Sequence, residues 1–388
     1  MLRYFTAGES HGEALVAFIS GLPAGLKVDQ ASLDHELWRR QQGYGRGGRM
    51  KIERDTAHIL SGVRQAHTIG SPIAILLENK DWKNWQESLP VAEGDPAKHK
   101  RVGSPRPGHA DLAGALKYNF PEARYVLERA SARESAARVA IGALAKLFLR
   151  ELGIDVASHV IGVGAVSISG NEIAWEKINR LREKQEILLN CAEAEAELRM
   201  KEEVDKVLKT GDSVGGVFEV VAHNVPAGLG TYAQWDERLD ALLAGAVMSL
   251  QAVKAVEIGT GIVAASSPGS SVHDEIGYGA ASGFTRTRNN AGGIEGGVSN
   301  GQDIRVRGYL KPISTLRRPL QSVDFATREP VKAAYERSDV CVVPAAGVGA
   351  EAMVALTLAR CALEKFGGDS MTETLRNFHG YCQQLKNY

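Results

Sequence analysis

Short apolar runs alternate along this chain with longer stretches in which apolar residues recur every three to four positions. The short runs are rich in Leu, Val and Ile and lie close to Gly or Pro, which is typical of strands. The longer stretches have the period of an amphipathic helix. The short runs predict strands at Ala14–Ile19, His58–Val63, Ile73–Leu77, Asp155–Val163, Gly216–Ala222, Val256–Ala264, Asp303–Gly308 and Val340–Pro344. The periodic stretches predict helices at Asp29–Gln42, Arg133–Leu152, Gln234–Val253 and Val348–Phe366.

The segment from Ala174 to Thr210 has a different pattern. Lys and Glu crowd it at helical spacing and it contains no glycine, as expected of solvated helices with ion pairs between residues four apart. We expect this segment at the periphery of the fold. Gly367 and Gly368 follow the last predicted helix and would form its C-cap. The whole pattern predicts an α+β fold in which helices cover mainly antiparallel sheets.

Composition excludes several classes of protein. The 388 residues are 44% hydrophobic and 24% charged, which is ordinary for a folded protein, and length alone allows one unit or two. Lys plus Arg equals Asp plus Glu at 46 each, which argues against a protein held to polyanions by its overall charge. The four cysteines form no CxxC pair, so neither a zinc site nor a disulfide framework is indicated and a reducing cytoplasm fits best. No apolar stretch reaches the roughly 18 residues of a membrane span.

Three polar, glycine-containing loops carry the candidate chemistry. Gly8–Gly12 places Ser10 and His11 between glycines that allow a ligand close to the backbone, although a capped turn would have the same composition. Arg39–Arg49 sets four arginines on a helix end and a glycine-rich loop, which favours carboxylate or phosphate. An RGG-like RNA-binding segment or a solvated charge run are the alternatives there. Arg101–Asp111 again joins arginine to a histidine, in a loop that prolines stiffen.

Further along the chain, three segments add donors for an anionic or flat ligand. Arg129–Ser135 leads into a helix whose first turn is cationic, where a bound anion would be favourable unless Glu134 simply neutralises the neighbouring arginines. Asn289–Asn300 contains four glycines, and Lys311–Thr315 supplies an ammonium group and two hydroxyls.

Two other stretches match the spacing of a dinucleotide fingerprint. Gly347–Ala352 fits GxGxxA after a predicted strand and before a predicted helix, but no second strand with a ribose-binding acid follows. Gly259–Ala264 has the same spacing inside a predicted strand. Both signals are therefore weak.

Taken together, the glycine-rich loops resemble the signature segments of the chorismate synthase family, in the family's order, from Gly8 to Gly349. The segments that carry the resemblance are GESHG, RRQQGYGRGGRM, RPGHAD, RASARES, NNAGGIEGGVSNG, LKPIST and ERSDVCVVPA. The resemblance implies a homotetrameric enzyme of the shikimate pathway, with one domain over residues 1–388 built as a sandwich of antiparallel β-sheets around helices. It also implies a carbon–oxygen lyase that removes phosphate from 5-enolpyruvylshikimate 3-phosphate by 1,4-anti elimination, with reduced FMN as a transient electron donor.

The resemblance further implies roles for individual residues. His11 would protonate the departing phosphate, His109 would protonate or stabilise the anionic reduced flavin, and Asp339 would accept a proton near flavin N5. The residues implied for the substrate's anionic groups are Ser10, Arg40, Arg46, Arg49, Arg106 and Arg133. The residues implied for FMN are Arg129, Ala130, Ser131, Gln251, Ala252, Gly296, Lys311, Pro312, Ile313, Ser314, Thr315 and Arg337. No metal, nucleic acid or membrane partner is implied.

Two alternatives remain at this point. The chain could be an NADPH-dependent flavin reductase, alone or in addition to the lyase, since some members of the family make their own reduced flavin. It could also be a non-enzymatic module that binds anions or RNA through its arginine loops.

Overall fold

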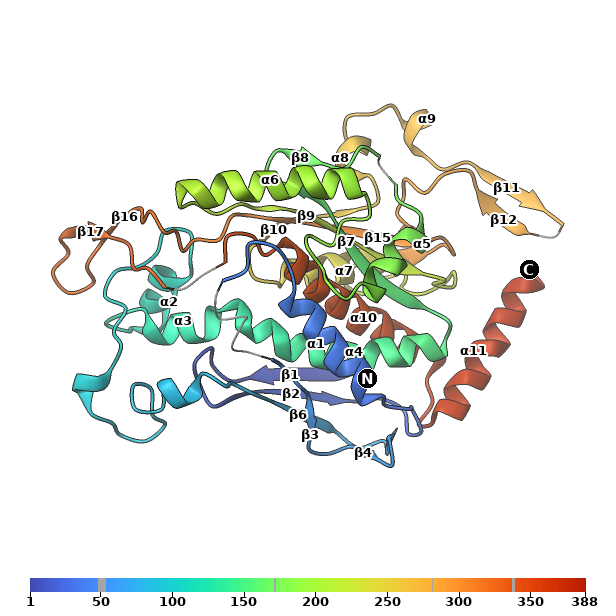
Figure 1. Cartoon of the computed structure of the whole chain (residues 1–388). Coiled ribbons are helices and arrows are strands. Elements are labelled where there is room, and N and C mark those ends of the chain that lie inside the picture. Colours follow the sequence, from blue (N-terminus) through green and yellow to red (C-terminus); the bar gives the residue numbers. More distant parts are fainter. Residues whose placement is uncertain (48–53, 171, 281, 337–338) are drawn as a thin grey trace.

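The computed structural model describes residues 1–47, 54–170, 172–280, 282–336 and 339–388, and arranges them as two antiparallel sheets with helices between them (Figure 1). The first sheet has the order β1-β2-β6-β3 and the second the order β10-β15-β9-β7-β8. The first comprises β1 (Arg3–Ala7), β2 (Ala14–Ser20), β3 (His58–Ile59) and β6 (Ile73–Glu78). The second comprises β7 (Asp155–Val163), β8 (Val166–Ser167), β9 (Gly216–His223), β10 (Val253–Ile258) and β15 (Ile304–Leu310). The predicted α+β sandwich is confirmed.

The first sheet shows why the layers form. Leu15, Ala17 and Ile19 alternate along β2 and are completely buried, whereas Val16 and Phe18 between them are each 37% exposed. Since successive side chains of a strand point to opposite faces, one face of this sheet is apolar and must be covered. It packs against the helical layer of α1 (Gln30–Gln41), α4 (Ser135–Glu151) and α10 (Val343–Phe366), which lies between the two sheets (Figure 1).

The helical layer is packed closely and contains a buried charge network. A Cβ added to Gly142 of α4 would lie 2.3 Å from the Cβ of Ala352 in α10, so only glycine allows the two helices to approach this closely. The Arg39 guanidinium donates to both carboxylate oxygens of Glu351 at 2.7 Å, and Lys146 donates to the same carboxylate. These contacts join the three helices α1, α4 and α10. Helix α10 is apolar and long enough to cross a membrane, but 83% of its apolar window is buried, as in a core helix.

Two predicted strands end where helices begin. Val340–Pro344 is wrong, because α10 starts at Val343 and Pro344 fits its first turn, where no backbone donor is needed. Val256–Ala264 is wrong in its second half: β10 ends at Ile258, and Gly261–Ala264 is the short helix α8. The carboxylate of Glu257 accepts a hydrogen bond from the backbone N–H of Ile262 and so stabilises the first turn of that helix.

Other predicted elements are shorter than expected. Of the predicted helix Gln234–Val253, only Leu239–Met248 (α7) is α-helical. The predicted strand His58–Val63 is interrupted, because β3 ends at Ile59 and the next strand begins only at Val63. The charged segment holds α5 (Trp175–Asn179) and α6 (Ala194–Thr210), and α6 lies on the outer side of the second sheet (Figure 1). That helix is not solvated all round, because Ala196, Met200 and Val204 join the main core.

The remaining elements were not predicted. They are α2 (Asp111–Tyr118), α3 (Arg124–Ala130), α9 (Gly269–Val272), α11 (Met371–Lys386), β4 (Val63–Arg64), β5 (His67–Thr68), β11 (Ile276–Gly279), β12 (Gly283–Arg286), β13 (Ile294–Glu295), β14 (Val298–Ser299), β16 (Gln321–Val323) and β17 (Pro330–Lys332). Helices α2 and α3 and the loops beside them carry part of the candidate site.

Candidate active site

The loop between β1 and β2 presents His11, and a glutamate of α3 holds it. Both carboxylate oxygens of Glu128 accept hydrogen bonds from this one residue: Oε2 from the His11 backbone N–H at 2.7 Å, and Oε1 from the Nδ1 atom of the ring at 2.9 Å. The imidazole also stacks on Trp85, with 3.9 Å between the ring centroids. Burial raises the pKa of Glu128, but the hydrogen bonds and charge of His11, with help from Arg124, outweigh burial and leave that pKa below its usual value. Glu128 is therefore a carboxylate at neutral pH.

Beside His11, two buried arginines surround one aspartate. The Nη1 atom of Arg133 donates to both oxygens of Asp55, at 2.7 and 2.6 Å, and its Nε donates to Asn79 at 2.9 Å. Arg40 donates from Nε to Ser135 Oγ at 2.9 Å and from Nη2 to the Ala132 carbonyl at 2.8 Å. The remaining nitrogen, Nη1 of Arg40, is buried and makes no hydrogen bond within the described residues, lying 3.8 Å from Asp55.

Among the described residues, this cluster carries three arginines against the two carboxylates of Asp55 and Asp339. Burial lowers the pKa of Arg40 to about 9; Asp55 opposes this shift, and the nearby cations Arg133 and Arg46 add to it. Arg46 lies 3.3 Å from Asp339, and the second oxygen of Asp339 accepts the Gly47 N–H at 2.5 Å. Because buried guanidinium groups repel one another unless an anion lies between them, the arrangement is suited to a carboxylate or phosphate.

The second histidine lies at the start of α2. Its Nδ1 atom lies 2.5 Å from Asp111 Oδ1, and Arg106 donates to the same carboxylate from Nε at 2.8 Å and from Nη2 at 3.0 Å. Burial raises the pKa of Asp111, but the hydrogen bonds from His109 and Arg106 dominate and leave it well below its usual value. Arg106 also donates to Thr315 Oγ1 at 2.9 Å, and Lys311 donates to the Gly108 carbonyl. The Arg101–Asp111 and Lys311–Thr315 loops therefore meet.

Several of the residues predicted to bind flavin make contacts with the loops that carry these two groups. Arg129 donates to the Gly8 carbonyl at 3.0 Å, and Ser131 Oγ accepts from Ser10 Oγ at 3.1 Å. Gln251 donates to Glu134 at 3.1 Å. The next residue, Ala252, has a φ of +70°, and its carbonyl accepts the Lys311 N–H at 3.0 Å. These contacts connect the His11 loop, the start of α4 and the Lys311 loop.

Not every predicted residue joins this network. Gly296 lies apart, in the turn between β13 and β14, where a Cβ would meet only Tyr232 within 4 Å among the described residues. The carbonyl of Ile313 accepts the Ser213 hydroxyl at 2.6 Å. Arg49 and Arg337 lie outside the described residues. The remaining predicted residues are Ala130, Pro312 and Ser314. They belong to the loops that make these contacts, but their side chains make no polar contact within the described residues.

The predicted neutralisation at the start of α4 is also visible. Glu134 lies 2.9 Å from Arg138 and accepts a hydrogen bond from Thr6 at 2.6 Å. Arg133 instead pairs with Asp55. Glu134 therefore neutralises Arg138, and Arg133 remains part of the cluster around Asp55.

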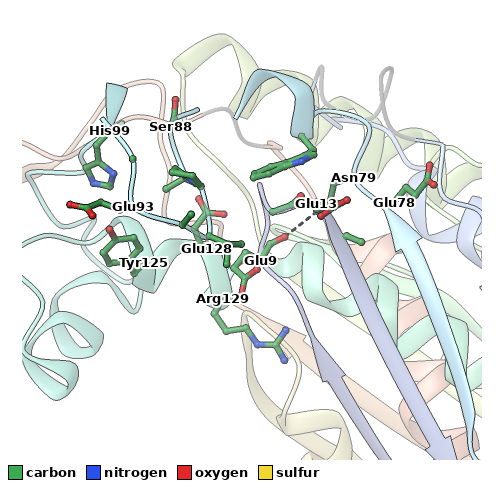
Figure 2. Close-up of a pocket in the computed structure, with 18 of the residues that line it drawn as sticks. Glu9, Glu13, Glu78, Asn79, Ser88, Glu93, His99, Tyr125, Glu128 and Arg129 are labelled. Carbon is green, nitrogen blue, oxygen red and sulfur yellow. Dashed lines mark hydrogen bonds between the residues drawn. The ribbon is translucent and has the colours of Figure 1, made fainter. Parts of the chain in front are cut away.

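A large cavity borders this network on one side (Figure 2). It has a volume of about 1440 Å³, and the carboxylates of Glu9, Glu13, Glu93 and Glu128 lie around it. Of the predicted site residues that the structure describes, only Arg129 lines it. Since most of the charged groups facing the cavity are anionic, it is unsuited to an anionic substrate. That the arginines share a pocket of their own stays a prediction.

Four residues of the network were missed by sequence reasoning: Asp55, Asn79, Trp85 and Glu128. Each acts on a partner far along the chain; Asp55 and Arg133, for example, are 78 residues apart. No local pattern marks such a residue. The one available signal was chemical, because several buried arginines require carboxylates close by.

Comparison with known proteins decides the family. A family model described as chorismate synthase matches residues 2–363. A protein named chorismate synthase from Koribacter versatilis (strain Ellin345) is 74% identical over 393 aligned residues, and the alignment covers all of both chains. The chain belongs to the chorismate synthase family. A second chorismate synthase, from Acidobacterium capsulatum, is 68% identical over the full length of both proteins. A crystal structure of chorismate synthase is 40% identical, has a TM-score of 0.79 and covers 100% of this chain and 99% of its own.

Family membership confirms several expectations. Chorismate synthases are lyases of aromatic amino-acid biosynthesis, so the chain is an enzyme of that class, and the binding-module alternative is wrong. The flavin reductase alternative is not needed to account for the matches. The fingerprint at Gly347–Ala352 lies inside helix α10, not at a turn between strand and helix, so it is no dinucleotide site.

Proposed function

We propose that this member of the family removes phosphate from 5-enolpyruvylshikimate 3-phosphate by 1,4-anti elimination, giving chorismate, and that it requires reduced FMN. The observation that carries the proposal is the excess of positive charge that Arg40, Arg46 and Arg133 give to the described residues beside His11, with Arg40 and Arg133 buried. The substrate carries two carboxylates and a phosphate, which are the groups that guanidinium binds with charge-assisted hydrogen bonds. We assign Ser10, Arg40, Arg46, Arg49, Arg106 and Arg133 to these groups.

The chemistry of the donor set fits FMN. The segment from Gln251 to Ala252 and the Lys311 loop meet through a backbone hydrogen bond, and Lys311, Thr315 and Arg129 provide cationic and hydroxyl donors there. Such donors suit the phosphate and the anionic reduced ring of the cofactor. When bound, reduced FMN would supply an electron transiently to an elimination whose ring hydrogen is not acidic. The proposed FMN contacts are the residues that the sequence predicts, with Gly296 and Arg337 among them.

The two histidines would serve as proton donors in different places. Because Nδ1 of His11 is bonded to Glu128, its Nε2 would give the proton to the departing phosphate. His109, held by Asp111, would protonate or stabilise the anionic reduced ring. Asp339 would accept the hydrogen lost from the substrate as a proton, near flavin N5, with Arg46 and the Gly47 N–H holding its carboxylate in place.

The test is phosphate release under anaerobic conditions. Purified protein with reduced FMN should release phosphate from the enolpyruvyl substrate and form chorismate in equal amounts, and should release none without the flavin. A second reaction containing NADPH and oxidised FMN tests the reductase alternative. No phosphate release with reduced FMN would refute the proposal.

We also propose that the protein is a homotetramer with one domain over residues 1–388, located in the cytoplasm. It would need no metal, no nucleic acid and no membrane partner. The burial of α10 in the core supports the absence of a membrane partner. Light scattering should give a mass of about four times the 41.7 kDa chain mass; a monomer would refute the tetramer.

A further inference from the structure

The ring of His11 is held by two residues that come from other parts of the chain. Glu128, in α3, is 117 residues away, and its carboxylate binds both the backbone and the ring of His11. A carboxylate that holds both groups of one residue fixes the side-chain rotamer as well as the loop. The orientation of the imidazole therefore depends on α3 rather than on the loop's own sequence.

Trp85, in the segment after β6, restrains the same ring from its face. The two rings are stacked at 3.9 Å with an angle of 28° between their planes. Trp85 is itself fixed, because its indole N–H donates to Asp81 at 3.1 Å and the Lys100 ammonium lies 3.9 Å from its ring centroid. A stacked aromatic limits rotation of the imidazole about its side-chain bonds.

The charge of Glu128 decides which ring nitrogen carries the permanent proton. An ionised carboxylate is only an acceptor, so the Nδ1 atom facing it must carry hydrogen. Among the described residues, Arg124 is a cation near Glu128; it lies 3.4 Å from Oε1 and donates to Glu336 at 2.8 Å. With Nδ1 occupied in this way, Nε2 is the nitrogen that can lose and regain a proton.

We propose that Glu128 and Trp85 are positioning residues for His11: Glu128 fixes the tautomer and rotamer of the imidazole, and Trp85 holds the plane of its ring. This inference rests on the proposed role of His11 as the acid for the departing phosphate. Neither residue needs to touch the substrate. Their effect would therefore fall on turnover much more than on substrate binding.

A second pair in the same region provides a matched control. Glu122 also uses one oxygen for a histidine, His99, and the other for a backbone N–H, that of Val102 at 2.7 Å. The bonding is of the same kind, but His99 has no proposed part in the reaction. Glu122→Gln thus makes the same chemical change at a pair outside the mechanism.

The experiment compares Glu128→Gln, Trp85→Phe, Trp85→Ala and Glu122→Gln in the full protein with reduced FMN. Glu128→Gln should lower kcat roughly tenfold to a hundredfold while KM changes by less than about twofold, as when the partner of a functional histidine is lost. Trp85→Ala should lower kcat by a smaller factor, and Trp85→Phe, which keeps a stacking ring, should restore most of it. Glu122→Gln should match the unmodified protein.

A spectroscopic measurement separates this inference from the proposed function. In ¹⁵N-labelled protein, the imidazole of His11, assigned by its loss in His11→Ala, should show hydrogen on Nδ1 when neutral, and Glu128→Gln should give a mixture of tautomers. If His11→Ala turns over normally, the acid role fails, but the tautomer result still tests Glu128. An unchanged tautomer together with unchanged kcat in Glu128→Gln would overturn the inference. If that variant does not fold, equal kcat values for Trp85→Ala and the unmodified protein would overturn it.

Discussion

His11 and His109 are each held by a buried carboxylate, but the two pairs are built differently. Asp111 is two residues from His109 and also binds the backbone N–H and the guanidinium of Arg106. Glu128 is 117 residues from His11 and binds the backbone and ring of that residue. The His109 pair is therefore part of a loop that organises itself locally, whereas the His11 pair depends on the tertiary fold.

The difference indicates what each carboxylate does. Asp111 neutralises Arg106, so its loss should affect the stability of the loop as well as His109. Glu128 has its shortest contacts with His11, so its loss should affect mainly the reaction. Variants of the two sites test this difference between Asp111 and Glu128, and the loss of Asp111 should have the largest effect.

Replacing Asp111 with alanine should give the largest change. Asp111 is fully buried and Arg106 is only 6% exposed, so the variant leaves an uncompensated guanidinium, which typically costs about 3–5 kcal/mol. Denaturant unfolding would measure the loss of stability. A loss below about 1 kcal/mol, at the level of an exposed ion pair, would show that Asp111 does not stabilise the loop.

Removing either imidazole should reduce turnover with little effect on folding. His11→Ala and His109→Ala should each lower kcat by about a hundredfold or more, the usual cost of a lost proton transfer. Circular dichroism and the unfolding midpoint would confirm that both variants fold. Near-normal turnover in both would reject the assigned roles.

The arginine cluster should control substrate affinity. Arg46→Ala should raise KM by about tenfold through the loss of one charge-assisted hydrogen bond. Arg150→Ala removes a partly exposed arginine whose partner is Asp155, 3.4 Å away, and serves as the control. An equal KM in Arg46→Ala and Arg150→Ala would show that Arg46 is not a substrate ligand.

The smallest expected effect is a pH dependence of stability. The pKa of Asp111 is lower in the folded protein than its ordinary value of 3.8, so its contribution is present above that pH and is lost as the pH falls through the folded-state pKa. The difference in unfolding free energy between the unmodified protein and Asp111→Ala should therefore shrink as the pH falls below about 4. Unfolding curves of both proteins at pH 7 and at low pH would measure it, and a constant difference would contradict the assignment.

The layers of the fold could be predicted from the sequence because burial imposes a period. Strand β2, for example, alternates buried and exposed residues over its full length. The predicted elements are wrong where local contacts override this period. Pro344 begins a helix after an apolar run, and α11 is so polar that its buried Met371 and Phe378 were not recognised as one face.

The candidate site divides in the same way. Gly-rich loops and their arginines could be identified because cations and glycines are unusual in such density. The carboxylates that orient them could not, because Asp55 and Glu128 act on residues 78 and 117 positions away. Those pairings join loops of the first sheet to α3 and to the start of α4, so they form only in the folded protein.

The most direct test of the central claim is a crystal structure with the substrate and FMN bound. The claim is that distant cationic loops form one anion site beside His11. We expect the substrate's phosphate to lie within about 3.2 Å of His11 Nε2 or of an arginine of the cluster. We also expect Arg40 Nη1 to donate a hydrogen bond to an anionic oxygen of the substrate. A substrate bound in the acidic cavity around Glu9, Glu13 and Glu93, away from Arg40 and Arg133, would contradict it.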